Sequence, residues 1–294
     1  MNQKPEANNK TGLGVFLMCF GVAALCVNDA TAKALGDTYS PLQILFLRNI
    51  IALPFAFLLV LKIEGPAGLS STRPLTHVSR GFFWIFAAYL FFTSFRYLGL
   101  AEATTLVFIA PMFVTALSVL FFKEKVGWRR WSAVIAGFAG VVIVMRPGSG
   151  TFDVVSLLPL ATALLYACLM LSARWVDPKE SVWTLMLYLV GTGALLSALT
   201  LPFIWVPIRP EDIWIFLTNA VFGTAGITMI TQAFRLAPAS VVAPLDYTAL
   251  LWAVLLGWLF WGEIPDWATY VGAAVIVASG IFIVLREQTQ KPMT

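Results

Sequence analysis

The sequence predicts an all-α membrane protein with ten transmembrane helices, arranged as two inverted five-helix repeats. Of its 294 residues, 60% are hydrophobic and 12% are charged, whereas soluble domains carry about 25% charged residues. Apolar runs long enough to cross a bilayer recur along the whole chain. The two halves also resemble each other at a constant offset. Together these observations exclude a soluble globular protein.

Ten apolar runs separated by short polar breaks define the predicted helices. The expected spans are 12–35, 41–62, 80–98, 102–122, 129–146, 153–175, 180–203, 212–234, 239–261 and 267–286. They divide the chain into an N-terminal tail (1–11), a first repeat (12–146), a second repeat (153–286) and a C-terminal tail (287–294). The first run continues into Asn28 and Asp29 and follows no small-residue cleavage site, so we expect a retained span and not a signal peptide.

Lysine and arginine are distributed unevenly over the predicted loops. With a cytoplasmic N-terminus, the outer segments hold Lys33, Arg96, Arg146 and Arg209, and Arg48 lies within the second span. The tails and inner segments hold the rest: Lys4, Lys10, Lys62, Arg73, Arg80, Lys123, Lys125, Arg129, Arg130, Arg174, Lys179, Arg235, Arg286 and Lys291. Because cytoplasmic loops are enriched in Lys and Arg, both termini are predicted to be cytoplasmic.

The internal repeat appears when the chain is aligned with itself at an offset of 139 residues. Phe95-Arg96 then matches Phe234-Arg235, Phe122-Lys-Glu124 matches Trp261-Gly-Glu263, and Trp128 matches Trp267. Spans 4 and 5 therefore repeat as spans 9 and 10. Since five spans are an odd number, the second half enters the membrane in the opposite orientation, an arrangement typical of secondary transporters. A duplicated bundle that serves as a scaffold or receptor is the alternative.

The segments LGLAEATTLVFIAPMFVTALSVLFFKEKVGWRRWSAVIAGFAGVVIVMRPG and LAPASVVAPLDYTALLWAVLLGWLFWGEIPDWATYVGAAVIVASGIFIVLRE carry a family resemblance. They resemble the paired EamA domains of the drug/metabolite transporter superfamily in the proline of span 4, the glutamates ending spans 4 and 9, and the glycine-rich spans 5 and 10. The resemblance implies a basket of ten helices around a central substrate cavity in a bacterial inner membrane, with spans 5 and 10 peripheral. It also implies export of amino acids. The opening NDATAKALG, with FLRNIIALPF and RPLTHVSRGFF, is similar to the S-adenosylmethionine carrier branch.

Polar residues inside spans 1 and 2 are the first candidates for substrate contact. Asn28 and Asp29 in span 1 and Arg48 in span 2 are expected at similar depth. A charge in hydrocarbon is costly unless it is paired or faces water, so these groups should point into the bundle. They either contact a zwitterionic substrate or form a structural ion pair. The spacing of Asp29 and Lys33 also allows an ion pair along the helix.

Span 9 carries Asp246 and Tyr247 just after Pro244. Proline frees a backbone carbonyl in the preceding turn, which can line a polar cavity. Asp246 is either a ligand for a substrate amine or a proton site, or the partner of Arg235 or Arg80 near the inner face. The remaining candidates lie on spans 3, 4, 6 and 8: Tyr89, Thr104, Phe108, Tyr166, Thr224, Thr228 and Gln232. Thr224, Thr228 and Gln232 share one helical face, a candidate cavity wall, while helix packing or lipid contact is the alternative for the small and aromatic residues of these spans.

Several chemistries lack a signature in the sequence. There is no glycine-rich nucleotide loop and no catalytic or metal-binding pattern, so we expect no enzyme activity, cofactor, metal or nucleic-acid partner. Cys19, Cys26 and Cys168 lie in apolar runs, and His77 is expected in a solvated loop. The chain is predicted to be a secondary transporter of small amphipathic metabolites, most simply an amino acid exporter, embedded in lipid as a monomer or weak homodimer. An S-adenosylmethionine carrier and a non-transporting scaffold or enzyme are the alternatives.

Overall fold

The computed structural model describes residues 4–124, 126–147, 154–177 and 180–289. Its α-helices are α1 (Lys4–Gly36), α2 (Pro41–Ile63), α3 (Pro74–Ser94), α4 (Leu100–Val107), α5 (Ala110–Phe122), α6 (Trp128–Met145), α7 (Leu157–Ser172), α8 (Val182–Ala198), α9 (Leu201–Ile204), α10 (Ile213–Leu236), α11 (Ala239–Val242), α12 (Ala249–Trp261) and α13 (Trp267–Thr289). Short 3-10 helices are Pro66–Leu69, Val154–Ser156, Ala173–Trp175, Pro210–Asp212 and η5 (Ala243–Thr248).

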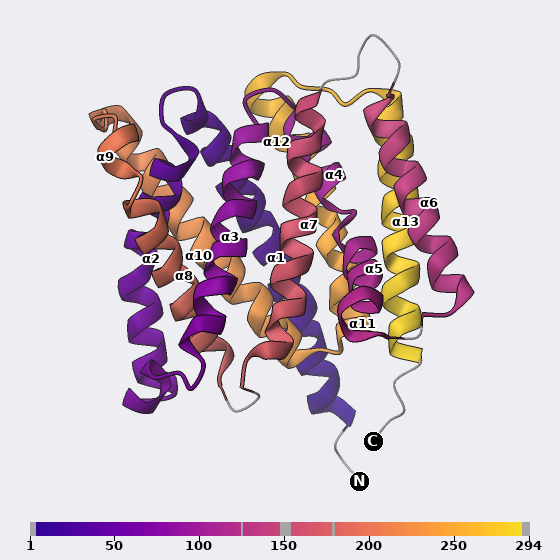
Figure 1. Cartoon of the computed structure of the whole chain (residues 1–294), viewed down its shortest axis with the longest axis horizontal. Coiled ribbons are helices and arrows are strands. Elements are labelled where there is room, and N and C mark those ends of the chain that lie inside the picture. The colour runs from indigo at the N-terminus through magenta and orange to yellow at the C-terminus, as the bar shows by residue number, and fades with distance from the viewer. Residues whose placement is uncertain (1–3, 125, 148–153, 178–179, 290–294) are drawn as a thin grey trace.

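These helices form one all-helical bundle that is built to cross a membrane. Within the described residues, nine helical segments are long and apolar enough to span a bilayer, and Val182–Ala198 is a shorter tenth. The helices run between two ends of the bundle, and the start of α1 and the end of α13 lie at the same end (Figure 1). We call this the terminal end and the opposite one the distal end. The prediction of an all-helical protein with ten spans is confirmed.

Helix packing follows the two-repeat pattern. The first and eighth spans, α1 and α10, pack along each other, and so do their counterparts α7 and α3. Equivalent spans also pair with one another: α2 packs on α8, and α6 packs on α13 (Figure 1). In the last pair the helices approach closely, since a Cβ at Gly140 would lie 3.0 Å from the carbonyl oxygen of Gly272. The two halves are therefore interleaved around a common pseudo-two-fold axis.

Spans 4 and 9 are both broken near the middle of the bundle. Span 4 is divided into α4 and α5, with Phe108 capping α4 and Pro111 in the first turn of α5. Span 9 passes from α11 through η5, which holds Pro244, before continuing as α12. Proline lacks the N–H that a continuous helix requires, which accounts for both interruptions. The breaks put the two discontinuous spans at equivalent positions of the repeat.

The prediction that His77 is a solvated loop residue is wrong. Helix α3 begins at Pro74, whose fixed φ suits a first turn, so His77 lies inside the helix and is 1% exposed. Its Nε2 lies 2.7 Å from Oε2 of Glu180, and its ring stacks on Tyr188 at 4.5 Å. The third span thus starts at Pro74, six residues before its predicted start at residue 80.

Glu180 ties the loop after α7 to the loop before α3. Burial raises the pKa of Glu180, but hydrogen bonds from the Ser71 hydroxyl (2.6 Å), from His77 and from the Thr72 amide (3.1 Å) outweigh burial. The pKa of Glu180 is therefore held below its ordinary value of 4.5. This contact joins the two loops at the terminal end of the bundle.

Some predictions fall on parts of the chain that the structure leaves undescribed. The predicted start of span 6 at residue 153, the C-terminal tail beyond 289, and Lys125, Lys179 and Lys291 lie outside the described residues. Helix α1 begins at Lys4, so most of the predicted N-terminal tail continues the first helix. The predicted boundaries of the two repeats remain predictions.

Candidate functional site

The break in span 9 places an acidic group beside aromatic rings. Asp246 and Tyr247 lie on η5, and the ring of Tyr247 lies 4.8 Å from that of Phe108 at the end of α4. Asp246 also interacts electrostatically with Tyr166 of α7 and with Cys26 of α1. We call Phe108, Tyr166, Asp246 and Tyr247 the aromatic site.

Asp246 is an exposed side chain although it lies in a membrane-spanning segment. Cys26 of α1 and Tyr166 of α7 interact with Asp246, and Phe108 of α4 contacts the adjacent Tyr247, so the space to which Asp246 is exposed lies between these helices, inside the bundle. Tyr166 and Tyr247 are half-buried on the same space. The arrangement offers a carboxylate and three aromatic faces to a ligand, which is the composition of a cation-binding site.

A second polar group lies nearer the distal end. Asp29 on α1 and Arg48 on α2 are each seven residues from the distal end of their helix, about 10 Å along the axis. They interact electrostatically but are not among the direct ion pairs of the described residues. Arg48 is 6% exposed and lies over the ring of Trp84, with 5.5 Å between its Cζ and the ring centroid.

Side chains around Arg48 present hydrogen-bond donors that lack acceptors. The Nδ2 atoms of Asn28 and Asn49 and the indole Nε1 of Trp84 are buried without a hydrogen-bond partner. Arg48, Asn49, Trp84 and Thr224 line a small cavity of about 30 Å³. We call Asn28, Arg48, Asn49 and Trp84 the donor cluster.

The depth difference between the two sites can be read along α1. Cys26, three residues from Asp29, donates a hydrogen bond to the carbonyl of Ala249 (3.6 Å). Asp246 precedes Ala249 by three residues, on the 3-10 segment that lies toward the terminal end. With rises of 1.5 and 2.0 Å per residue, Asp246 is about 10 Å closer to the terminal end than Asp29.

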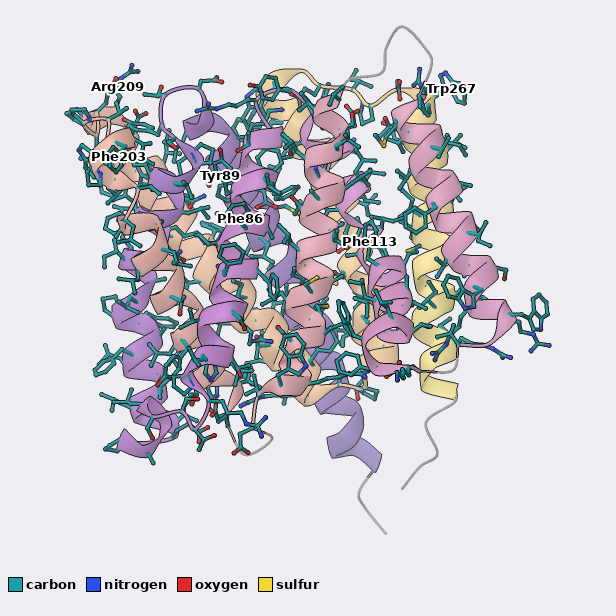
Figure 2. The ribbon with its side chains drawn as sticks, viewed as in Figure 1. Phe86, Tyr89, Phe113, Phe203, Arg209 and Trp267 are labelled. Carbon is teal, nitrogen blue, oxygen red and sulfur yellow. The ribbon has the colours of Figure 1, made fainter. Side chains whose placement is uncertain are left out.

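The other predicted site residues are less closely tied to these two groups. Thr224 borders the cavity at Arg48, while its hydroxyl and those of Thr104 and Thr228 donate to carbonyls one turn back at 2.7–2.8 Å. Gln232 is half-buried near the terminal end of α10. Tyr89 contacts Phe86 edge-on at 6.3 Å, and the two rings lie on the same part of α3 (Figure 2).

The predicted pairings of Asp29 with Lys33 and of Asp246 with Arg80 or Arg235 are wrong. Lys33 does not pair with Asp29: its Nζ binds a carboxylate oxygen of Glu263 and the Leu98 carbonyl (3.2 Å), because α12 ends against this part of α1. Arg80 donates to the Leu169 carbonyl and the Ser172 hydroxyl, so it does not serve Asp246.

Arg235, the other proposed partner of Asp246, lies 5.1 Å over the ring of Trp183. Since α10 carries Arg235 on its last turn toward α8, the cation is directed away from the aromatic site. Among the described residues, Asp246 is not part of a direct ion pair.

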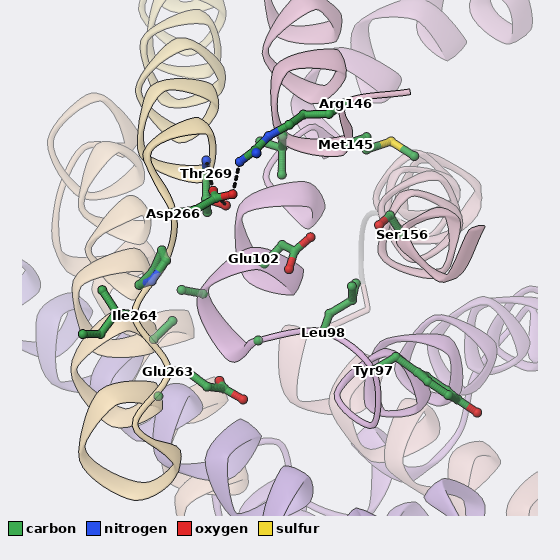
Figure 3. A pocket seen from close by; sticks show the side chains of 16 residues that line it. Tyr97, Leu98, Glu102, Met145, Arg146, Ser156, Glu263, Ile264, Asp266 and Thr269 are labelled. Atoms are coloured by element: carbon green, nitrogen blue, oxygen red, sulfur yellow. Dashed lines mark hydrogen bonds and ion pairs between the residues drawn. The ribbon is translucent and has the colours of Figure 1, made fainter. Parts of the chain in front are cut away.

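A pocket of about 480 Å³ opens at the distal end between α4, α6, α12 and α13. Figure 3 shows Glu102, Glu263 and Asp266 around it, with Arg146 paired to Asp266. None of its lining residues was predicted as a site residue. We call this acidic pocket at the distal end the vestibule.

Ion pairs at the two ends of the bundle are related by the repeat. Glu263 ends span 9 and binds Lys33 of span 1; its counterpart Glu124 ends span 4 and binds Arg174, which follows span 6. The hydrogen bond from Arg174 lowers the pKa of Glu124. Each half thus contributes one glutamate that ties a broken span to the opposite half.

Two residues next to these polar groups were not predicted from the sequence. Asn219 of α10 is fully buried and donates to the backbone carbonyl of Asn28 (2.8 Å), so it fixes the helix turn that carries the donor cluster. A lone asparagine inside an apolar run was the available signal. Glu263 was read as the end of a helix, and nothing local indicates that it binds Lys33.

Comparison with known proteins gives the family. A family model described as "EamA-like transporter family" matches residues 12–146 and 154–285. An S-adenosylmethionine uptake transporter of Rickettsia felis is 26% identical, covering 95% of this chain and 94% of its own. A riboflavin transporter of Vibrio cholerae is 32% identical over 70% of each chain. A solved crystal structure matches 97% of this chain and 99% of its own with a TM-score of 0.63 at 18% identity, which shows the fold alone.

These matches agree with the observed architecture of a doubled, all-helical bundle with polar groups inside its membrane-spanning segments. The chain therefore belongs to the EamA-like transporter family, and it is a multi-pass membrane transporter of a small metabolite and not an enzyme.

Proposed function

We propose that the chain is a secondary carrier for a cationic amino-acid derivative, with S-adenosylmethionine as the substrate to test first. The observation that carries the proposal is the aromatic site, where the exposed carboxylate of Asp246 lies among Phe108, Tyr166 and Tyr247. A sulfonium cation is attracted both by the carboxylate and by aromatic faces. The similarity to S-adenosylmethionine uptake transporters over nearly the full length supports this choice.

The energetics favour a charged ligand at Asp246. An ionised carboxylate in a membrane-spanning segment costs several kcal/mol unless it is paired or hydrated. Direct cationic partners among the described residues do not supply that pairing. A cationic substrate would pair with the carboxylate while it is bound, so binding energy is concentrated in the substrate charge.

Alternating access is the proposed transport cycle. The interleaved halves, with equivalent breaks in spans 4 and 9, can exchange conformations to open the internal space toward either side. Proton coupling would use Asp29 or Asp246, and replacing both with Asn would abolish any dependence of transport on a pH gradient. Uptake that a pH gradient still drives in the double variant would exclude that coupling.

Orientation follows from the basic residues. Few basic residues lie at the distal end; those that contact groups there are Lys33, Arg96, Arg146 and Arg209. Most of the other Lys and Arg residues belong to the segments at the terminal end. With the positive-inside rule, the terminal end is proposed to face the cytoplasm of a bacterial inner membrane. The distal vestibule then opens outward.

Export of free amino acids is the second candidate. Asp29 and Arg48 lie close together with opposite charges, which suits the amino and carboxylate groups of any α-amino acid. This candidate needs the distal polar group but not the aromatic site. The two functions therefore differ in their dependence on Asp246.

The test is counterflow of labelled S-adenosylmethionine in proteoliposomes, comparing wild type, Asp246→Asn and the matched control Asp266→Asn. We expect Asp246→Asn to reduce the initial rate about tenfold or more, because a hydrogen-bonded charge contact contributes roughly 1.5–3 kcal/mol. Asp266, in the outer vestibule, should tolerate the change. S-adenosylhomocysteine, which lacks the sulfonium charge, should compete weakly. Equal competition by S-adenosylhomocysteine, or stronger competition by free amino acids, would overturn the cation assignment.

A further inference from the structure

The donor cluster has a surplus of hydrogen-bond donors over acceptors. Arg48 is a permanent cation with five N–H donors, and it is 6% exposed. Asn28, Asn49 and Trp84 each add a buried N–H group without a partner. Buried polar groups are normally hydrogen-bonded, so this concentration of unused donors from α1, α2 and α3 indicates a place for an acceptor that the chain does not supply.

The neighbouring groups do not satisfy this surplus. Asp29 interacts with Arg48 only at a distance beyond a direct ion pair. The Oδ1 of Asn28 lies beside Arg48, since both approach the position that a Cβ at Gly223 would occupy, at 3.2 and 2.8 Å. The Oδ1 of Asn219, whose Nδ2 donates to the Asn28 carbonyl, is a further buried acceptor without a partner. Two amide oxygens still cannot serve a guanidinium and three further N–H groups.

The space at the cluster is large enough to admit an oxygen atom. The cavity bordered by Arg48, Asn49, Trp84 and Thr224 is about 30 Å³, above the ~10–15 Å³ that a single water-sized group requires. Its walls beyond these residues are the apolar side chains of α2, α8 and α10. An oxygen of a carboxylate can therefore be placed there, within reach of these donors.

We propose that the donor cluster is an anion subsite that binds the carboxylate of the transported metabolite through Arg48, Asn28, Asn49 and Trp84. This assignment rests on the proposed function, because it names the second end of the same substrate. A carboxylate offers about four lone-pair sites to N–H donors and pairs with guanidinium in a planar, two-bond geometry. Asp29, adjacent to the cluster, receives the substrate amino group.

The donor cluster and the aromatic site together select for the length of the substrate. Asp246 lies about 10 Å closer to the terminal end than Asp29. An α-amino acid group held at the donor cluster therefore reaches the aromatic site only if the metabolite carries an extended substituent. The pair of sites favours a long amino-acid derivative over small free amino acids.

The first experiment tests the subsite without assuming the substrate. Purified protein in detergent is heated in propionate or in chloride at equal ionic strength, for wild type, Arg48→Gln and the control Arg235→Gln. Arg235 also lies over a tryptophan ring but belongs to the terminal end. We expect propionate to stabilise wild type and Arg235→Gln and to have no such effect on Arg48→Gln, since a ligand that binds the folded state raises its stability. An equal response of wild type and Arg48→Gln, or no response of wild type, overturns the subsite.

A second variant keeps every charge in place. A Cβ at Gly223 would lie 2.8 Å from Nε of Arg48, so Gly223→Ala should displace the guanidinium and weaken propionate binding. Unchanged propionate affinity in this variant contradicts the geometry even if Arg48→Gln folds poorly.

Binding measurements with the proposed substrate distinguish a failure of the anion subsite from a failure of the proposed function. Wild type should bind S-adenosylmethionine about 10- to 100-fold more tightly than its decarboxylated analogue, the range expected for hydrogen bonds to a charged group. Arg48→Gln should remove this preference, whereas Asp246→Asn should weaken both compounds equally. If neither compound binds while the propionate effect stands, the proposed function fails and the subsite remains. If both bind equally well to wild type, the subsite fails and the function remains.

Discussion

The two repeat-related glutamates should differ sharply in their contribution to stability. In Glu263→Ala, Lys33 loses its carboxylate partner and keeps the Leu98 carbonyl, and the Leu100 amide loses its acceptor at 3.0 Å. The Lys33 side chain is only 7% exposed, so water cannot replace the lost contact. Removing one partner of a buried pair costs about 3–5 kcal/mol, and the partial exposure of Glu263 places the expected loss near the lower end, about 3 kcal/mol.

Glu124→Ala is the matched control. Glu124 and Arg174 occupy the equivalent place in the other half, but their side chains are 37% and 45% exposed. Exposed pairs contribute about 0–1 kcal/mol. The same substitution therefore probes the same pseudo-symmetric contact at two degrees of burial.

Thermal unfolding in a fixed detergent and lipid mixture measures the difference. At roughly 2–4 °C per kcal/mol, we expect Tm to fall by about 6–12 °C in Glu263→Ala and by less than about 4 °C in Glu124→Ala. Adding Lys33→Met to Glu263→Ala should recover part of the loss, because it removes the unpaired buried charge. Equal shifts in the two single variants, or no recovery in the double variant, would refute the assignment of the cost to the stranded lysine.

Two further predictions concern other contacts. Because the folded-state pKa of Glu180 is lowered, the stabilising effect of its carboxylate is complete above its ordinary pKa of 4.5 and is lost as pH falls through the lower folded value. Glu180→Gln should therefore flatten that part of a plot of Tm against pH. A slope unchanged from wild type would contradict the contact of Glu180 with His77. Gly280→Ala should destabilise the protein by about 1–3 kcal/mol through overpacking, because a Cβ there would overlap the hydroxyl of Tyr247. Gly12→Ala, which meets nothing within 4 Å inside α1, should leave Tm unchanged or raise it slightly, since alanine favours a helix over glycine by about 0.5–1 kcal/mol. Equal behaviour of the two variants would argue against the clash.

The sequence predicts the spans well because lipid imposes a single requirement on each of them. A helix in hydrocarbon must be apolar and about 20 residues long, so the runs around Asp29 and Arg48 could be placed with their depth from local composition alone. The repeat was equally accessible, since the match of Glu124 with Glu263 needs no structure. Charge placement in loops then supplied the orientation as a prediction.

Partners across the bundle could not be predicted in this way. Lys33 and Asp29 have the spacing of a helical ion pair, yet Lys33 binds Glu263, which is 230 residues away in the chain. The burial of His77 was missed for a related reason: a polar first turn beginning at Pro74 reads as a loop until α8 and the loop before it are in place. The spacing of residues along a helix shows which ion pairs are possible, but tertiary packing determines which of them form.

The contact of Phe108 with Tyr247 has a consequence for how the protein can vary. These residues are equivalent in the two repeats, yet they touch each other, as identical residues do across the axis of an isologous dimer. In a true dimer, a substitution at such a position would appear twice and meet itself. Gene fusion removes that restriction, so one ring can gain a hydroxyl while its counterpart stays apolar. In the proposed aromatic site, this asymmetry would let one half specialise in holding the ligand while the other supplies the surface against which the ligand is held.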